Sequence, residues 1–264
     1  MAGAIKLADD TELKESSASY ATPALEKGLD ILELLAHERD GLTKSEVARG
    51  LGRTVSEIFR MLVCLERRGY ISQASGDRYV LSLRLFQLVQ EHPPTERLMS
   101  EALPRMHAFV EIVQQSCHLG VLEAGKVVVL AHSNAPGSMG FYVKPGASVD
   151  LMESSTGHVI LAHLPRDARQ RMLDEWRSET GGKIAADLSR HLEQIRRRGY
   201  EKRASYQVRG VTNISYPIRD AEGRAVAALT VPYINRINVG SSMAQVERAL
   251  ARTARDISAA LGAH

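Results

Sequence analysis

The chain has few cysteines and no long apolar run. Its 264 residues include only Cys64 and Cys117, which lie far apart and outside any CxxC spacing. This scarcity excludes a disulfide framework and a cysteine-based zinc site, and predicts two reduced, buried thiols. No apolar run approaches the roughly 18 residues that a membrane-crossing helix needs. Charged residues interrupt the first twenty positions, which resemble neither a signal peptide nor an anchor, so we expect a cytoplasmic protein without a membrane partner.

A strong net charge is also lacking, because the formal balance is only +3. That value alone would not indicate a nucleic-acid partner, but the distribution of charge does. Residues 49–84 hold seven arginines against three acidic residues, which gives 7 − 3 = +4: Arg49, Arg53, Arg60, Arg67, Arg68, Arg78 and Arg84 against Glu57, Glu66 and Asp77. A local cationic surface of this kind is what phosphate contact requires. A solvated helical face would have the same composition.

Two short helices in tandem are predicted after an amphipathic helix over residues 24–36. Thr43 and Glu46 have the spacing of a capping box, in which each side chain accepts a hydrogen bond from the other residue's backbone N–H. Thr54 and Glu57 repeat the pattern eleven residues later, after the breaker Gly52. The apolar stripe of the second of these helices is predicted to be Val55, Ile58, Leu62 and Leu65. Such a pair predicts a helix-turn-helix.

Helix-turn-helix folds place the N-terminal half of the second helix in the major groove of DNA. Arg60 has the reach for a guanine edge or a phosphate, and Ser56 suits a phosphate oxygen. Strands over 70–72 and 78–81 predict a basic hairpin wing. The candidate DNA-contacting residues are Arg53, Thr54, Ser56, Glu57, Arg60 and, on the wing, Arg78. The alternative is that three helices and a hairpin merely form a small core.

The helix predicted over 82–90 is apolar on more than one side and ends before Pro93. We therefore expect a linker that also provides a dimer contact. Beyond it, a helix over 103–113 precedes predicted strands at 118–122, 126–132, 141–144, 214–219 and 225–231, and a helix over 243–261 closes the chain. This order lacks regular βα alternation and predicts an α+β domain with a mainly antiparallel sheet flanked by helices.

Hydroxyl groups are concentrated where a candidate ligand site begins. Ser154, Ser155, Thr156 and Gly157 stand at the start of an apolar helix, whose free backbone N–H groups attract carboxylates and phosphates. Ser215, Thr230 and Pro232 would form a second wall if the strands on either side of Gly223 pair, and Ser205 lies upstream of them. The alternative is a simple helix cap with ordinary strand residues beside it.

No metal and no cofactor is assigned from the sequence. His158 and His163 lie five apart on a helix and so face different directions, which does not suit two ligands. His118 and His132 can meet on neighbouring strands, but no carboxylate or cysteine has matching spacing. A G-x-S-x-G nucleophile elbow is also missing, so a hydrolase is the weaker alternative and no catalytic residue is assigned.

Nearly the whole chain, from about residue 24 to 261, resembles the IclR family of transcription regulators. The resemblance rests on ALEKGLDILELLA, LTKSEVARGLG, FRMLVCLERRGYI and DRYVLSLRLFQL in the first part, and on HLGVLEAGKVVVLAH, STGHVILAHL, RRGYE and GVTNISYPIRDAEGRAVAALTVP in the second. It implies a winged helix-turn-helix, a helical linker and a GAF-like effector domain, assembled as a dimer or a dimer of dimers and often acting as a repressor.

The same resemblance places the effector pocket on Ser155, Thr156, Gly157, Ser205, Ser215, Thr230 and Pro232. Many members carry an acidic residue at position 205, Cys or Ala at 215 and Ser at 232, so another member's hydrogen-bonding pattern does not transfer. Effectors in this family are commonly organic acids, sugar acids or aromatic compounds.

The predicted organisation is a flexible tail over 1–20, a winged helix-turn-helix over 21–82, a linker helix over 83–100 and an effector domain over 101–264. The predicted function is a sequence-specific regulator that binds double-stranded operator DNA under control of a small effector. A DNA-binding protein whose second domain only oligomerises is the alternative.

Overall fold

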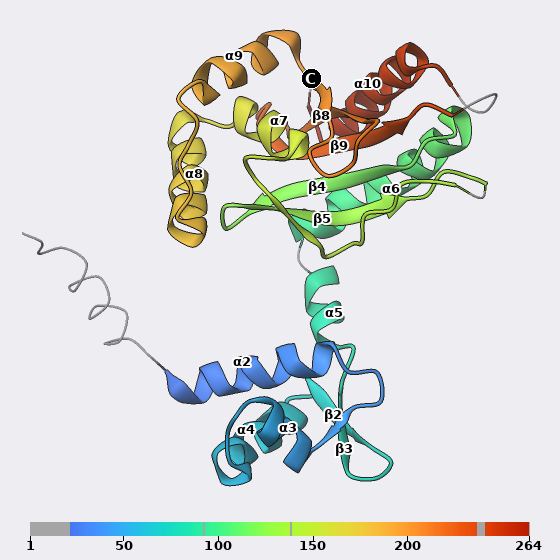
Figure 1. Cartoon of the computed structure of the whole chain (residues 1–264). Coiled ribbons are helices and arrows are strands. Elements are labelled where there is room, and N and C mark those ends of the chain that lie inside the picture. The colour runs from blue at the N-terminus through green and yellow to red at the C-terminus, as the bar shows by residue number, and fades with distance from the viewer. Residues whose placement is uncertain (1–21, 92, 138, 237–240, 264) are drawn as a thin grey trace, which may run out of the picture. The chain divides into compact units, whose positions relative to one another are not determined.

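A computed structural model describes residues 22–91, 93–137, 139–236 and 241–263. The predicted N-terminal tail lies outside these residues. The chain divides into two compact units, residues 1–92 and 93–264, which are described separately (Figure 1). Residues 93–100, predicted as linker, belong to the first helix of the second unit.

The first unit packs three helices against a small antiparallel sheet. Its elements are α2 (Pro23–Ala36), β1 (Leu42–Thr43), α3 (Lys44–Gly50), α4 (Val55–Arg67), β2 (Ile71–Ala74), β3 (Arg78–Leu81) and α5 (Arg84–Gln90). The strand order is β1-β3-β2. Ile31 and Leu35 of α2 pack with Ile58 and Leu62 of α4 and with Tyr79 of β3 to form the core. This arrangement is the predicted winged helix-turn-helix.

Both predicted capping boxes are present. The backbone N–H of Thr43 donates to Glu46 Oε2 at 2.8 Å, and that of Thr54 donates to Glu57 Oε2 at 2.8 Å. The prediction for Val55 is wrong, because its side chain is 39% exposed rather than part of the core stripe. Val55 occupies the first turn of α4, where the helix extends past the edge of the core.

Among the described glycines of the first unit, Gly41 leaves the least room for a Cβ atom. Its φ of +69° is one that L-residues with a Cβ rarely adopt, and an added Cβ would lie 2.5 Å from the carbonyl oxygen of Tyr79. Gly76 in the wing has a similar φ of +77°, but a Cβ added there would meet no heavy atom within 4 Å.

We expect Gly41→Ala to destabilise the first unit by about 2–4 kcal/mol, because backbone strain of about 1 kcal/mol is joined by a steric clash. Gly76→Ala, the matched control, should cost only about 1 kcal/mol. Chemical denaturation followed by circular dichroism measures both. If the two variants lose the same free energy of unfolding, the clash with the Tyr79 carbonyl oxygen does not add to the cost.

The second unit is built on a six-stranded sheet with helices on both faces (Figure 1). Its elements are α6 (Pro93–Val113), β4 (Cys117–Glu123), β5 (Lys126–Ser133), β6 (Ser148–Asp150), α7 (Ser155–His163), α8 (Arg166–Thr180), α9 (Leu188–Arg198), β7 (Glu201–Ala204), β8 (Val211–Arg219), β9 (Ala225–Ile234) and α10 (Met243–Ala260). The strand order is β6-β5-β4-β9-β8-β7, and every pairing is antiparallel.

Two apolar clusters cover the two faces of this sheet. One joins α6 and α10 to the strands through residues such as Met106 and Leu250, and the other joins α7, α8 and α9 through residues such as Leu161 and Ile195. Cys117 is buried in the first cluster, and burial raises the pKa of its thiol, whereas Cys64 in the first unit is only half-buried. The α+β class with a flanked antiparallel sheet is therefore confirmed.

The edge strands differ from the prediction. Residues 141–144 do not form a strand; the turn that follows, with Gly146 at φ +82°, leads instead into β6. Pro145 and Gly146 form this turn. β7 has no strand signal in the sequence, because Glu201–Ala204 shows no alternation of apolar residues.

Candidate DNA-binding and effector-binding sites

The N-terminal half of α4 presents polar residues on the surface of the first unit. Ser56 and Arg60 are exposed, and the hydroxyls of Thr54 and Ser56 lie 3.1 Å apart. Arg60 and Arg67 line a shallow depression together with Phe59, Val63 and Cys64. This face combines cationic and apolar groups, the two chemistries that read base edges and thymine methyl groups.

Two of the predicted contact residues are engaged inside the unit. Arg53 lies 3.6 Å from Asp30 of α2, and Glu57 lies 3.7 Å from Lys27 of the same helix. The hydrogen bond from the Thr54 backbone holds the pKa of Glu57 below its usual value, so this carboxylate stays ionised beside the helix start. A DNA contact by Arg53 or Glu57 therefore competes with these exposed ion pairs, which are worth little free energy.

Arg78 also has partners within the unit. Its guanidinium donates to the carbonyl oxygen of Gly41 at 2.8 Å and to Glu46 Oε2 at 3.2 Å. These bonds tie the wing strand β3 to the start of α3. The structure thus gives Arg78 an internal role, and its DNA contact stays a prediction.

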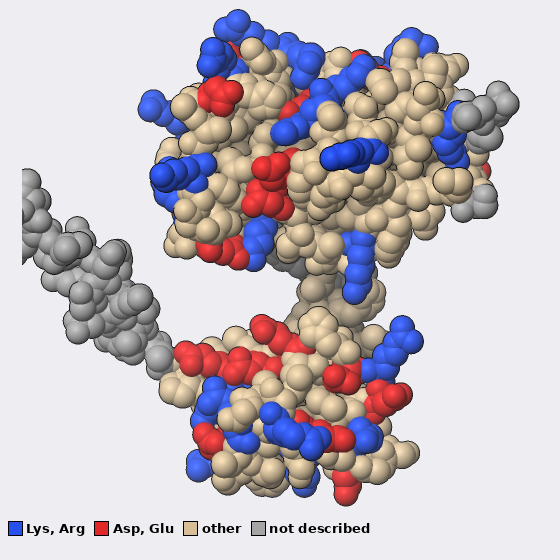
Figure 2. All heavy atoms as spheres, viewed as in Figure 1, with Lys and Arg blue, Asp and Glu red and all other residues tan. Residues whose placement is uncertain are grey.

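Two further residues on this surface were missed by the sequence analysis. The Lys44 ammonium lies 5.6 Å from the ring centroid of Phe59, a cation–π distance, and Phe59 is 46% exposed. Phe59 lies outside the predicted apolar stripe, which includes its neighbour Ile58, and the sequence gives no signal that an exposed aromatic ring would meet Lys44. Figure 2 shows acidic side chains along α2, which carries Glu26, Asp30 and Glu33, and others elsewhere on the face of the first unit in view, interspersed with basic side chains.

In the second unit, most of the predicted effector residues come together around one small cavity. It is lined by the predicted Ser154, Ser155, Thr156, Ser205, Thr230 and Pro232, and also by His118, Val127, Phe141, Val143, Val149, Tyr206, Gln207 and Asn213. The predicted pairing of Ser215 with Thr230 across β8 and β9 is confirmed. Among the described residues that line the cavity there is no lysine or arginine.

A chain of four buried hydroxyls adjoins this cavity, and three of them, those of Ser155, Thr156 and Thr230, belong to residues that line it. Ser155 Oγ lies 2.9 Å from Ser215 Oγ, Ser215 Oγ lies 2.8 Å from Thr230 Oγ1, and Thr230 Oγ1 lies 2.8 Å from Thr156 Oγ1. Three mutual bonds use three of the four hydroxyl protons, so one proton is left to donate elsewhere. Gly120 permits this approach, because a Cβ there would lie 2.8 Å from Cγ2 of Thr156.

Ser154 and Gly157 have structural roles beside the hydroxyl chain. Ser154 is the N-cap of α7, and its Oγ accepts from the Gly157 backbone N–H at 3.2 Å. A Cβ at Gly157 would lie 2.8 Å from the carbonyl oxygen of Leu151, so glycine is required for close packing there. The simple-cap alternative therefore fits Ser154, whereas the Ser155 and Thr156 hydroxyls face the sheet.

His118 adds a neutral imidazole to the cavity wall. Burial, together with the nearby His132, lowers its pKa to about 4. Its Nε2 lies 3.5 Å from Thr156 Oγ1, while Nδ1 is buried without a hydrogen-bond partner. An unpaired buried polar atom costs free energy, which a ligand or a water at this wall would recover.

The cavity is about 40 Å³, enough for a few water molecules and too small for an organic acid. Two of the lining residues, Tyr206 and Gln207, are exposed and belong to the segment between β7 and β8. Binding of a larger ligand therefore requires this segment to move.

A helix-turn-helix unit followed by a unit with a hydroxyl-lined cavity defines a ligand-responsive DNA-binding regulator. The IclR helix-turn-helix domain model matches residues 24–75, and the model for the C-terminal domain of the bacterial transcriptional regulator IclR matches residues 95–259. The chain belongs to the IclR family of transcriptional regulators.

Individual relatives agree with this assignment. The HTH-type transcriptional regulator BhcR of Paracoccus denitrificans is 30% identical over 213 residues, 79% of this chain and 76% of that protein. The HTH-type transcriptional repressor AllR of Salmonella typhimurium is 25% identical over 259 residues, 94% of this chain and 93% of that protein. An IclR homolog from Microbacterium hydrocarbonoxydans, solved with 4-hydroxybenzoate, has the same fold, with a TM-score of 0.73, 23% identity, and coverage of 90% of this chain and 98% of that chain.

These relatives are regulators of transcription. Within the part of the chain that the structure describes, no helix is both long and apolar enough to cross a membrane.

Proposed function

We propose that α4 enters the major groove of operator DNA, with Arg60 at the base edges and Arg53, Thr54, Ser56 and Glu57 around it. The exposed polar N-terminal half of α4 is the observation that supports this placement. Phe59 and Lys44 extend the same surface, so Phe59 is a candidate contact for thymine methyl groups and Lys44 for a phosphate. Arg78 would contact DNA only after its ion pair with Glu46 is broken.

We also propose that the protein acts as a homodimer, or a dimer of dimers, on a pseudo-palindromic operator. Large apolar side chains are exposed on α2 and around α5, with Leu25 at 61%, Leu83 at 75% and Phe86 at 58%. Burying such a side chain stabilises a protein by roughly 1.5–3 kcal/mol relative to leaving it in water. A second copy of the chain that covers these side chains would therefore form a stabilised dimer. Two winged units related by a two-fold axis would then read two half-sites.

The effector class that the residues around the cavity suit best is a small organic acid with an apolar, aromatic body, which would enter once the segment between β7 and β8 has moved aside. Hydroxyls and the α7 N-terminus would hold the carboxylate, while Phe141, Val127 and Val149 would pack on the ring. The relative solved with 4-hydroxybenzoate supports this class. Sugar acids are the second candidate, since the hydroxyls of Ser155, Thr156 and Thr230 line the cavity and can exchange hydrogen bonds with a polyol.

In this proposal a cytoplasmic, non-enzymatic repressor releases its operator when the acid binds. The test is in vitro selection of a DNA site with the full-length protein, followed by gel-shift titration with hydroxybenzoates and sugar acids. Release of DNA by one acid, with no consumption of that acid, is the expected result. Retention of DNA with every acid, and no thermal shift, would favour the alternative in which the second unit only oligomerises.

We expect Thr156→Val to raise the Kd of the effector about 10-fold, because one buried hydrogen-bonding group is removed without changing the side chain's shape. The same substitution at Thr253, on the α10 side of the sheet, should leave the Kd unchanged. Calorimetric titration of both variants gives the comparison. Equal affinity of Thr156→Val and wild type would place the ligand away from the hydroxyl chain.

A further inference from the structure

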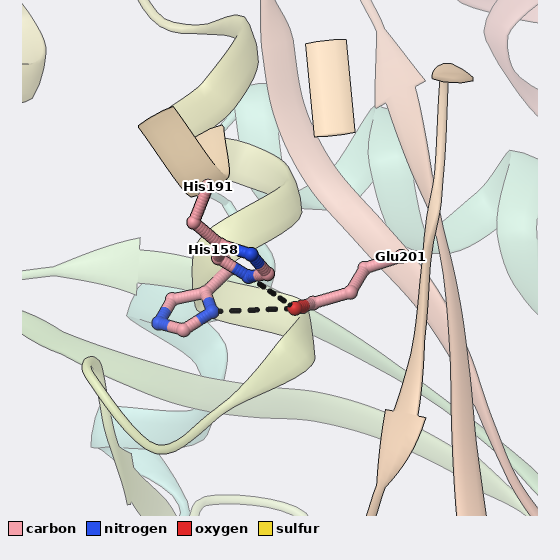
Figure 3. Close-up of side chains that lie close together, drawn as sticks. All are labelled: His158, His191 and Glu201. Atoms are coloured by element: carbon pink, nitrogen blue, oxygen red, sulfur yellow. Dashed lines mark hydrogen bonds and ion pairs between the residues drawn. The ribbon is translucent and has the colours of Figure 1, made fainter. Parts of the chain in front are cut away.

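Three titratable side chains from distant parts of the second unit meet outside the hydroxyl-lined cavity (Figure 3). His158 comes from α7, His191 from α9 and Glu201 from β7. Glu201 Oε1 lies 2.7 Å from His191 Nε2 and 3.4 Å from His158 Nδ1. One donor atom of each residue lies within 4.8 Å of the other two.

Hydrogen bonding alone leaves this cluster poorly satisfied. Glu201 is fully buried, and its Oε2 has no hydrogen-bond partner; the same holds for Nε2 of the buried His158. His158 Nδ1 is approached both by the Glu201 carboxylate and, at 3.2 Å, by the Arg203 guanidinium. The carboxylate needs a proton on Nδ1 and the guanidinium needs a lone pair, so one nitrogen cannot serve both.

We propose that His158 Nδ1, His191 Nε2 and Glu201 bind a divalent transition metal ion of the zinc type. A cation accepts the lone pairs of both imidazoles and neutralises the buried carboxylate, which removes the conflict at Nδ1. Zinc bonds of about 2.0–2.2 Å in a tetrahedron place donor atoms roughly 3.3 Å apart. The separations of 2.7 and 3.4 Å that involve Glu201 lie on either side of that value, and the donor atoms of the two imidazoles lie within 4.8 Å of each other, so side-chain rotations would complete the site.

Arg203 does not block the site. Its side chain keeps 34% exposure, and it lines an open cavity of about 620 Å³ beside the cluster, so the guanidinium has room to turn away. Trp176 and Asp187 line the same cavity. Three protein ligands leave a fourth position for water or an added carboxylate on this side.

The cluster also adjoins the hydroxyl chain through the backbone. His158 follows Ser155 by three residues on α7, and Glu201 pairs directly with Ser215 in the sheet. A metal ion there would fix α7 against β7 and so hold two members of the hydroxyl chain in place. The inference itself stands apart from the proposed function, because metal binding requires neither DNA nor effector.

The test uses the untagged full-length protein, stripped with a chelator and titrated with Zn²⁺ and then Co²⁺. We expect one tight equivalent per chain, a visible Co²⁺ absorption band typical of four-coordinate nitrogen and oxygen ligands, and quenching of Trp176, the single tryptophan, by Co²⁺. His191→Ala and Glu201→Gln should each weaken Zn²⁺ binding by about 100-fold or more. His107→Ala, which removes an exposed imidazole on α6, should bind like wild type.

Circular dichroism and gel shift with the selected operator show whether each variant is folded. His191 is the safer position, because its side chain is 36% exposed and its loss leaves little unfilled space. Wild type that takes up no more Zn²⁺ than folded His191→Ala would overturn the proposal. So would a folded His191→Ala that keeps the wild-type affinity and Co²⁺ spectrum. Either result leaves the operator and effector assays unaffected.

Discussion

Arg60→Ala is expected to weaken binding to the selected operator about 10- to 100-fold. Arg60 is exposed in the N-terminal half of α4, the part of the recognition helix that reaches base edges in this class of fold. A bidentate contact between arginine and guanine is worth about 1–3 kcal/mol of discrimination, which sets the size of the loss. Gel-shift titration at fixed salt measures it.

The control is Arg68→Ala, which removes the same charge from the opposite end of α4. Arg68 is the C-cap residue of that helix and is exposed, so it should contribute a phosphate contact at most. Repeating both titrations with unselected DNA separates the two roles, since loss of a phosphate contact weakens all sequences alike and lowers the salt slope by about 1. Undiminished operator affinity of Arg60→Ala would remove the recognition-helix placement.

The second large effect is expected when the pH is lowered, because the folding stability of the protein should fall. His118 has a pKa of about 4 in the folded protein against an ordinary value of 6.5, because burial disfavours its charged form. Below pH 6.5 the unfolded chain therefore binds a proton that the folded chain does not, and folding stability falls as the pH drops toward 4. Between pH 7.5 and pH 5, this group alone should lower the free energy of unfolding by about 2 kcal/mol.

The measurement is calorimetric unfolding of wild type and His118→Gln at the two pH values. Between pH 7.5 and 5, the unfolding temperature of wild type should fall by about 5 °C more than that of the variant. The unfolding temperature of a domain of this size shifts by about 2–4 °C for each kcal/mol of stability. His107→Gln, at an exposed position, should follow wild type. If His118→Gln shows the same pH dependence as wild type, another group is responsible for it.

The helix-turn-helix was predictable because its signals are local. Capping boxes join residues three apart, as Thr43 does with Glu46, and the structure has both of them. The exposed Val55 shows the limit of that reasoning, since only packing decides how far along a helix the core reaches. The ion pairs of Arg53 and Arg78 were unpredictable for the same reason, because Asp30 and Glu46 lie elsewhere in the sequence.

The effector site was partly predictable. Ser155 and Thr156 are recognisable from their place at a helix start, and the turn at Gly223 predicts that Ser215 meets Thr230. The place of His118 in the cavity was not predictable, because its position opposite Thr230 depends on β4 pairing with β9, far along the chain. Phe141 reaches the cavity although its segment is not a strand.

By itself the sequence determined the positions of most helices and strands, because caps, turns and apolar periodicity act over a few residues, and the family was indicated by the resemblance of its motifs. Only the tertiary structure decided which side chains meet. His158, His191 and Glu201 lie on a helix, another helix and an edge strand, and no spacing between them predicts contact. Their meeting depends on how α7 and α9 pack around one apolar cluster and on the pairing of β7 with β8 at the sheet edge. Hydrophobic burial selects this arrangement, and the positions of the polar groups follow from it.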